Sequence, residues 1–247
     1  MQISCVTDRT QLDSPPAGFT LMELLVTVVI VALVATLVLA GAGVVRQQTQ
    51  QAVCMGNQRQ LGVAILGYGQ DHHGDFPMTS HGLDASNHTS SWVFSLAEYL
   101  ADVDEVRICP ADPKGKERLE AHGTSYVLNS YLTVAQQDPF GRSLGGFTNL
   151  NQLSSPATTP LAFIINFSKG VGYGNDHTHS ESWDSWGRML TDIQPDAFRG
   201  DWHGPDRTKG SANYLFADGH VENLPAAQIQ SWITSGHNFA NPASSPQ

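Results

Sequence analysis

Apolar residues are concentrated in one long run near the N-terminus. Residues 24–45 read LLVTVVIVALVATLVLAGAGVV, without a charged side chain. About 20 apolar residues in a helix cross the hydrocarbon layer of a bilayer, where only a helix satisfies every backbone amide of a lone segment. The pattern predicts one transmembrane segment over residues 19–45. A buried core helix and a secretory signal peptide, cut after Ala40-Gly41-Ala42, are the alternatives.

Helical periodicity continues past this run. No proline occurs over residues 46–68. One face is largely apolar at helical spacing, and polar residues occupy the other. The first face carries Val53, Asn57, Leu61, Ala64, Ile65 and Tyr68, and the second carries Gln47, Gln48, Gln51, Gln58 and Arg59. The pattern predicts one continuous helix whose second half packs on a globular body.

The rest of the chain alternates short apolar segments with loops rich in glycine, proline and serine. A helix is predicted over residues 91–103, strands over 106–108, 126–134, 161–167, 213–216 and 220–224, a short helix over 225–233, and long loops over 136–160 and 168–210. Ala217-Asp218-Gly219 separates the last two strands, and glycine at such a turn favours a hairpin. We expect one α+β domain over residues 46–235, followed by a flexible tail over 236–247.

Composition narrows the function classes. The 247 residues include 13 Lys and Arg against 23 Asp and Glu, which gives a net charge of −10. Nucleic-acid binding is not expected, because neutralising phosphates requires a basic surface. Five Trp, six Tyr and ten Phe can build a core, so wholesale disorder is excluded.

The junction before the apolar run contains an acidic residue. Gly18-Phe19-Thr20-Leu21-Met22-Glu23 directly precedes residue 24. A carboxylate at the start of a membrane segment is costly, and it indicates a functional role with a partner cation. This hexapeptide resembles the processing site of type IV prepilins and of the pseudopilins of type II secretion.

That resemblance implies roles for three residues. Residues 1–18 would be a leader that prepilin peptidase removes by cutting after Gly18, and Phe19 would become the N-methylated terminus. Glu23 would be the assembly residue, with its carboxylate paired to the terminal amine of a neighbouring subunit. The sequence departs from the family at Pro15-Pro16-Ala17, where prepilin leaders usually carry Lys or Arg.

The same resemblance implies an architecture, a location and partners. Pilin-like proteins have a long N-terminal helix, transmembrane in its first half, packed on an antiparallel sheet with long loops. The implied location is the inner membrane, single-pass, with the C-terminal domain periplasmic, followed by a type IV pilus or a type II secretion pseudopilus. The implied partners are other pilin or pseudopilin subunits, the inner-membrane assembly platform and membrane lipid. Pilus and pseudopilus, and major and minor subunit, stay open alternatives.

A second resemblance extends over most of the chain. It rests on residues 54–64, 108–112, 125–129 and 213–221. These blocks are similar to a subfamily of bacterial prepilin-like proteins that ends in a His…Asp-Gly signature. Here fourteen residues separate His203 from Asp218, more than is usual in that subfamily.

Histidines with acidic neighbours are the candidate metal-binding residues. His177 and His179 alternate as in a strand and could bind zinc together with a third residue. The corresponding function is a membrane-anchored periplasmic metal-dependent enzyme or ligand-binding protein. The chain contains no His-Glu-x-x-His motif, and we expect a structural protein rather than an enzyme.

A structural calcium ion is the second metal hypothesis. Extracellular calcium sites use loop carboxylates, and some major pseudopilins hold calcium in a comparable loop. The loop over residues 168–210 contains Asp176, Asp184, Asp192 and Asp196. The candidate metal ligands are Asp176, His177, His179 and Asp184.

The cysteines leave two alternatives. Cys5 would be lost with the leader, and Cys54 and Cys109 would remain. An oxidising compartment permits a disulfide between them. Two free buried thiols fit equally well, since cysteine is among the most buried residue types.

Overall fold

The computed structural model describes residues 18–81, 87–135, 140, 146–200 and 204–244, except the side chains of residues 37–41 and 88. Residues 1–17 of the predicted leader, His203 and the last three residues lie outside this part of the chain. Residues 1–43 and 44–247 form two separate compact units, and each is described by itself.

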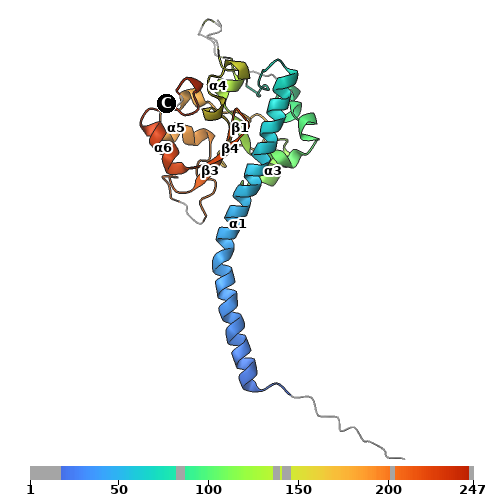
Figure 1. Cartoon of the computed structure of the whole chain (residues 1–247), viewed down its shortest axis with the longest axis vertical. Coiled ribbons are helices and arrows are strands. Elements are labelled where there is room, and N and C mark those ends of the chain that lie inside the picture. The colour runs from blue at the N-terminus through green and yellow to red at the C-terminus, as the bar shows by residue number, and fades with distance from the viewer. Residues whose placement is uncertain (1–17, 82–86, 136–139, 141–145, 201–203, 245–247) are drawn as a thin grey trace, which may run out of the picture. The chain divides into compact units, whose positions relative to one another are not determined.

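The described residues form six α-helices, seven short 3-10 helices and four strands (Figure 1). The α-helices are α1 (Leu21–Asp71), α2 (Trp92–Ser95), α3 (Gly115–Glu120), α4 (Ser130–Thr133), α5 (Trp186–Asp192) and α6 (Ala226–Thr234). The strands are β1 (Tyr126–Leu128), β2 (Pro160–Ile164), β3 (Ser211–Phe216) and β4 (Val221–Pro225). The 3-10 helices are η1 (His88–Ser90), η2 (Glu98–Leu100), η3 (Asp104–Arg107), η4 (Leu150–Gln152), η5 (Pro156–Thr158), η6 (Ser180–Ser182) and η7 (Pro242–Ser244).

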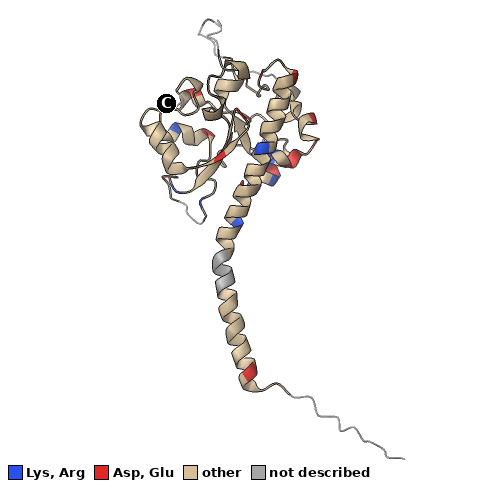
Figure 2. Cartoon of the chain, viewed as in Figure 1, with Lys and Arg blue, Asp and Glu red and all other residues tan. Residues whose placement is uncertain are grey.

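The predicted long N-terminal helix is confirmed as α1. Its first half is almost free of charge, apart from an acidic side chain near its start (Figure 2). Among the residues whose side chains are described, no helix is both long and apolar enough to cross a membrane. The membrane span over residues 19–45 stays a prediction.

The second half of α1 packs within the larger unit. Its buried face contains Cys54, Gln58, Leu61 and Ile65, at the spacing of one helical stripe. The placement of Gln58 on the polar face was therefore wrong, because its side-chain amide donates to the Asn213 carbonyl of β3 at 3.2 Å. A buried amide is tolerated where it satisfies a neighbouring backbone group.

One antiparallel sheet with the strand order β1-β2-β3-β4 forms the core. β2 is fully buried, as its apolar run predicted, and a bulge between Pro160 and Ala162 shifts its register against β3. The β3–β4 hairpin is confirmed, with Leu215 opposite Val221 and Gly219 in the turn at φ +92°. The chain is α+β, consistent with a pilin fold.

The predicted helix over residues 91–103 is wrong. α2 ends at Ser95 after one turn. Ala101 and Asp102 adopt φ of 51° and 58°, a left-handed conformation that ends the 3-10 helix η2. The predicted strand over 106–108 is wrong too, because residues 104–107 form the 3-10 helix η3.

The predicted strand over residues 126–134 is confirmed only in its first three residues. β1 ends before Asn129, whose side chain accepts a hydrogen bond from the Tyr131 amide and caps α4. Asparagine favours such caps because its side-chain oxygen replaces the missing helical acceptor.

The predicted flexible tail is corrected for its described part. Ala240 is fully buried, and its carbonyl accepts a hydrogen bond from Asn129 at 2.7 Å. The Phe239 ring lies 5.9 Å from the Phe163 ring of β2, edge to face. Aromatic pairs in this geometry stabilise a core, so residues 239–240 belong to it.

A buried ion pair connects two other parts of the larger unit. The Arg118 guanidinium in α3 donates from Nε to Asp112 Oδ2 at 2.7 Å, and both side chains are fully buried. Asp112 also accepts from the Ser125 hydroxyl at 2.8 Å, directly before β1. The same carboxylate thus holds α3 and the start of the sheet together.

Candidate processing motif and histidine cluster

The N-terminal motif forms a capping box at the start of α1. The Thr20 hydroxyl accepts from the Glu23 amide at 3.2 Å, and the Glu23 carboxylate accepts from the Thr20 amide at 3.0 Å. The Leu24 amide then donates to the Thr20 carbonyl at 3.2 Å. This reciprocal pairing satisfies amides that a helix start otherwise leaves without an acceptor.

The side chains that follow the motif are exposed. Every residue from 18 to 36 is exposed in the isolated chain. Phe19 is 82% exposed and Leu21 is 81% exposed. An apolar helix surface of this kind needs lipid or other protein to cover it.

Three histidines converge in the larger unit. His177 and His179 lie in an extended segment that joins the edge of β1, where the Thr178 amide donates to the Leu128 carbonyl at 3.0 Å. Alternate residues of such a segment point to the same side. His81, from the stretch after α1, completes the cluster, and one ligating atom from each histidine lies within 4.8 Å of the others.

Asp176 lies directly behind this cluster. Its carboxylate is fully buried and accepts from His177 Nδ1 at 2.8 Å. It also accepts from the Ser80 amide at 2.8 Å, and from the hydroxyls of Ser80 and Ser91 at 2.6 Å each. Asp176 therefore fixes the His177 ring and the backbone next to His81 at once.

Asp192 positions the backbone of His179. Its carboxylate accepts from the His179 amide at 2.8 Å, from the Trp183 indole at 2.9 Å and from the Lys169 ammonium at 2.8 Å. Burial acts to raise the pKa of Asp192, but the bond from Lys169 and the other donors outweigh burial and hold the pKa below its usual value. The carboxylate is thus charged at neutral pH.

The environment of His81 favours its neutral form. Partial burial, followed by the two neighbouring imidazoles of His177 and His179, lowers the pKa of His81. A neutral imidazole has a free lone pair, which is the form that ligates metals.

The structure brings together only part of the predicted ligand set. His177 and His179 lie in the cluster, whereas Asp176 is engaged behind His177. Asp184 is largely exposed and pairs with Arg188 at 3.4 Å. Sequence reasoning missed His81, because it lies far earlier in the chain and carries no local motif.

The remaining loop acid is also engaged by protein groups. Asp196 accepts from the guanidinium groups of Arg199 at 2.7 Å and Arg207 at 3.0 Å. Within the described residues, the histidine cluster is the one group of three or more His, Cys, Asp or Glu whose ligating atoms lie close enough to share an ion. A structural calcium ion in this loop stays a prediction, and Asp176, Asp192 and Asp196 are each engaged by protein groups.

Cys54 and Cys109 lie next to each other as free thiols. Both are buried, and the Cys109 thiol is hydrogen-bonded to Cys54. Burial, reinforced by that bond, raises the pKa of the Cys109 thiol well above its usual value. The Tyr126 hydroxyl donates to Cys54 Sγ at 3.4 Å. The structure therefore contains two free thiols rather than a disulfide between Cys54 and Cys109.

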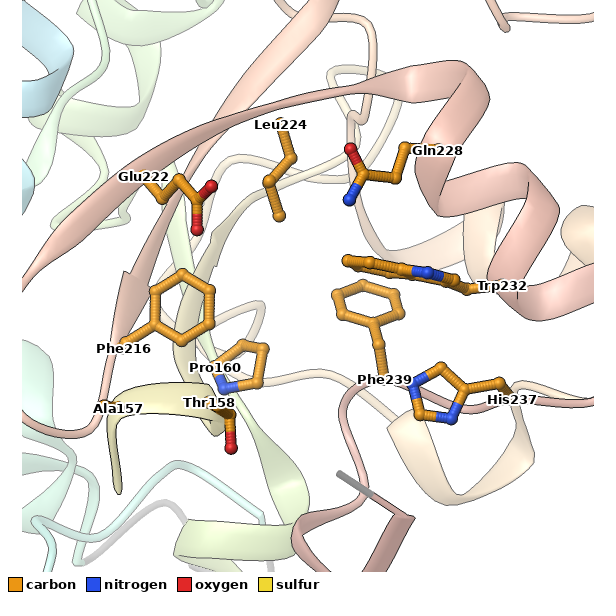
Figure 3. Close-up of a pocket in the computed structure, with 10 residues that line it drawn as sticks. All are labelled: Ala157, Thr158, Pro160, Phe216, Glu222, Leu224, Gln228, Trp232, His237 and Phe239. Atoms are coloured by element: carbon orange, nitrogen blue, oxygen red, sulfur yellow. The ribbon is translucent and has the colours of Figure 1, made fainter. Parts of the chain in front are cut away.

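A small pocket of about 150 Å³ lies at the edge of the sheet (Figure 3). Its walls are apolar, with Phe216 facing Trp232 and Phe239 across it. Thr158, Glu222, Gln228 and His237 supply its polar groups. The volume suits a group no larger than one ring, so we assign the pocket no function.

In the comparisons with known proteins, only the N-terminal segment of the chain gives a match. No curated protein and no solved structure matches the chain. The His…Asp-Gly signature stays a prediction, since His203 lies outside the described residues. Residues 15–39 match the family model of the prokaryotic N-terminal methylation motif. The chain therefore carries a prokaryotic N-terminal methylation motif, the hallmark of type IV prepilins and pseudopilins.

Proposed function

We propose that this protein is a pilin-like structural subunit. Prepilin peptidase cuts it after Gly18 and methylates Phe19, and the mature chain assembles into a type IV pilus or a type II secretion pseudopilus. The observation that carries this proposal is the methylation motif over residues 15–39. The α+β fold, with its long first helix, is consistent with it.

The exposed start of α1 supports a place in the membrane before assembly. Residues 24–45 contain no charged side chain, and every described side chain up to residue 36 is exposed. Lipid would cover this surface in the free subunit, and neighbouring helices would cover it in the filament. The inner membrane is the site of this step in the proposal, with the larger unit periplasmic.

Glu23 is the proposed assembly residue. A carboxylate in a low-dielectric environment is stabilised by a cation, and the N-methylated amine of Phe19 in a neighbouring subunit supplies one. Such a pair sets the axial register between subunits. The mature chain keeps 12 basic and 21 acidic residues, a net charge of −9, so attraction at this position also offsets repulsion between subunits.

An anchored periplasmic metal enzyme is the second candidate. The histidine cluster is the observation that favours it, because three histidine ligands leave one metal position open. The two candidates differ in their need for Glu23, since the anchor of an enzyme tolerates an apolar residue there and a filament subunit does not.

The first experiment is intact-mass and N-terminal analysis of protein extracted from membranes. A start at N-methylated Phe19 supports the proposal. A start at Met1, or near Ala42, contradicts it and leaves an uncleaved anchor or a released domain.

The second experiment measures assembly of the Glu23→Leu variant in sheared filaments. We expect the variant to be processed but absent from filaments. Met22→Leu is the matched control, because Met22 is an exposed neighbour without charge and should assemble normally. Incorporation of Glu23→Leu at the wild-type level would refute the pairing.

A further inference from the structure

We propose that His81, His177 and His179 bind a single zinc ion. The three rings come from two segments that are far apart in the sequence, and their ligating atoms lie within 4.8 Å of one another. The proposal stands on this geometry and does not depend on filament assembly.

The spacing of the rings fits one tetrahedral ion. A zinc ion bonded at about 2.0–2.1 Å to a ring nitrogen lies about 3.2 Å from the ring centre, so tetrahedral ligation places ring centres about 5.2 Å apart. The centre of the His177 ring lies 5.2 Å from that of His81 and 5.1 Å from that of His179. The His81–His179 spacing is 6.2 Å, so closure on the ion needs a small rotation of one exposed ring.

The hydrogen bonding of His177 selects its ligating atom. An ionised carboxylate only accepts hydrogen bonds, so the His177 Nδ1 that contacts Asp176 at 2.8 Å carries the proton. The lone pair of the neutral ring is then on Nε2. Metal-ligating histidines are commonly oriented by a carboxylate on the other ring nitrogen in this way.

Asp176 arranges two of the ligands before any ion arrives. It holds the His177 ring and the Ser80 backbone next to His81, and its own side chain is fully buried. Asp192 fixes the backbone of His179 in the same manner. Little ordering is left for the metal to impose, and preorganised ligands of this kind favour binding.

The ligand set also selects the class of metal. Imidazole nitrogens suit zinc and its transition-metal neighbours, whereas calcium takes six to eight oxygen ligands. With three protein ligands, water or another group occupies the fourth position. The bound ion would connect the stretch after α1 to the edge of β1, which stabilises the larger unit.

The test uses the full-length chain in detergent micelles, purified without a polyhistidine tag and stripped of metal. Zinc titration by calorimetry should give one ion per chain. Cobalt(II) loading should give the intense visible absorption of a tetrahedral site rather than the weak absorption of an octahedral one. Calcium should not compete.

Ligand variants decide where the ion binds. His81→Ala and His179→Ala change exposed side chains, and each should weaken zinc binding by more than about 100-fold, since loss of an outer-shell partner alone costs about 10–100-fold. His72→Ala is the matched control, because His72 is exposed, stacks on Tyr68 and lies outside the cluster. Its affinity should equal that of the wild type.

Several results would overturn the proposal. These are the absence of saturable zinc binding, an octahedral cobalt spectrum, competition by calcium, or unchanged affinity in both His81→Ala and His179→Ala. Asp176→Asn tests the positioning residue separately and should weaken binding about 10–100-fold. Its circular dichroism is recorded first, and if the fold is lost the two exposed variants still decide the outcome.

Discussion

Replacement of Asp112 by alanine should destabilise the protein strongly. The change removes the carboxylate that pairs with Arg118 at 2.7 Å, where both side chains are fully buried. The Ser125 hydroxyl and the Lys114 amide also lose their acceptor, at 2.8 Å and 2.9 Å. The guanidinium is left as a buried charge without its counter-ion, although it still donates to the Gly170 carbonyl.

The expected loss is about 3–5 kcal/mol, the usual cost of breaking a buried ion pair by removing one partner. For a folded unit of about 200 residues, 1 kcal/mol shifts the melting temperature by roughly 2–4 °C, so the fall should be about 6–20 °C. Such a loss is a large fraction of the roughly 5–15 kcal/mol that stabilises a typical domain.

Thermal unfolding of the full-length chain in detergent, followed by tryptophan fluorescence, measures this fall. Glu120→Ala is the control, because it also removes an acid from an ion pair, but with Lys116 at 3.8 Å and with both side chains exposed. The double variant Asp112→Leu with Arg118→Met should recover part of the stability, since an apolar pair leaves no buried charge. If Asp112→Ala unfolds no earlier than Glu120→Ala, the reasoning is refuted.

Three further predictions concern the metal, the hairpin and the helix. Chelation of the zinc-loaded chain should lower its melting temperature by about 5–10 °C, because a ligand at 100 times its dissociation constant stabilises by about 2.7 kcal/mol. Gly219→Ala should cost about 1–3 kcal/mol, measured by urea unfolding, since the turn requires φ of +92°. Leu61→Ala should cost about 2–5 kcal/mol in the same assay, because Leu61 is fully buried where α1 packs on the core.

Each of these has a matched control. His81→Ala should show no response to the chelator, and a response would mean that the ion binds elsewhere. Gly187→Ala should not destabilise the protein, because Gly187 lies in α5 and a Cβ there meets no atom within 4 Å. Val63→Ala, at a position that is 71% exposed, is the control for Leu61→Ala, and equal losses would contradict the packing of that helix face.

Sequence patterns correctly predicted those helices and strands that form because of residues close together in the chain. α1 follows from an uninterrupted apolar run and the absence of proline, and the β3–β4 hairpin follows from a glycine that permits its turn. The helix predicted over residues 91–103 failed because α2 ends at Ser95 and the left-handed angles of Ala101 and Asp102 end the 3-10 helix η2 that follows, and neither residue type gives a strong signal for such angles.

The candidate site was predictable only in part, because part of it depends on contacts between residues that are far apart in the sequence. His177 and His179 have the alternation of an extended segment, so their pairing could be read from the sequence. His81 joins them through the tertiary fold and through the bonds of Asp176 to Ser80, which no spacing in the sequence encodes. Asp176 was predicted as a metal ligand, whereas it accepts hydrogen bonds behind the cluster. That role depends on the same tertiary contacts, which the sequence does not show.

The capping box at Thr20 and Glu23 has a consequence for the proposed filament subunit. The Glu23 carboxylate already accepts from the Thr20 amide and hydroxyl within its own chain, at 3.0 Å and 2.9 Å. A subunit withdrawn from its neighbours would return to these bonds rather than carry an unsatisfied charge back into lipid. In the proposed filament, a released subunit would therefore keep its Glu23 carboxylate hydrogen-bonded and stay ready for reuse.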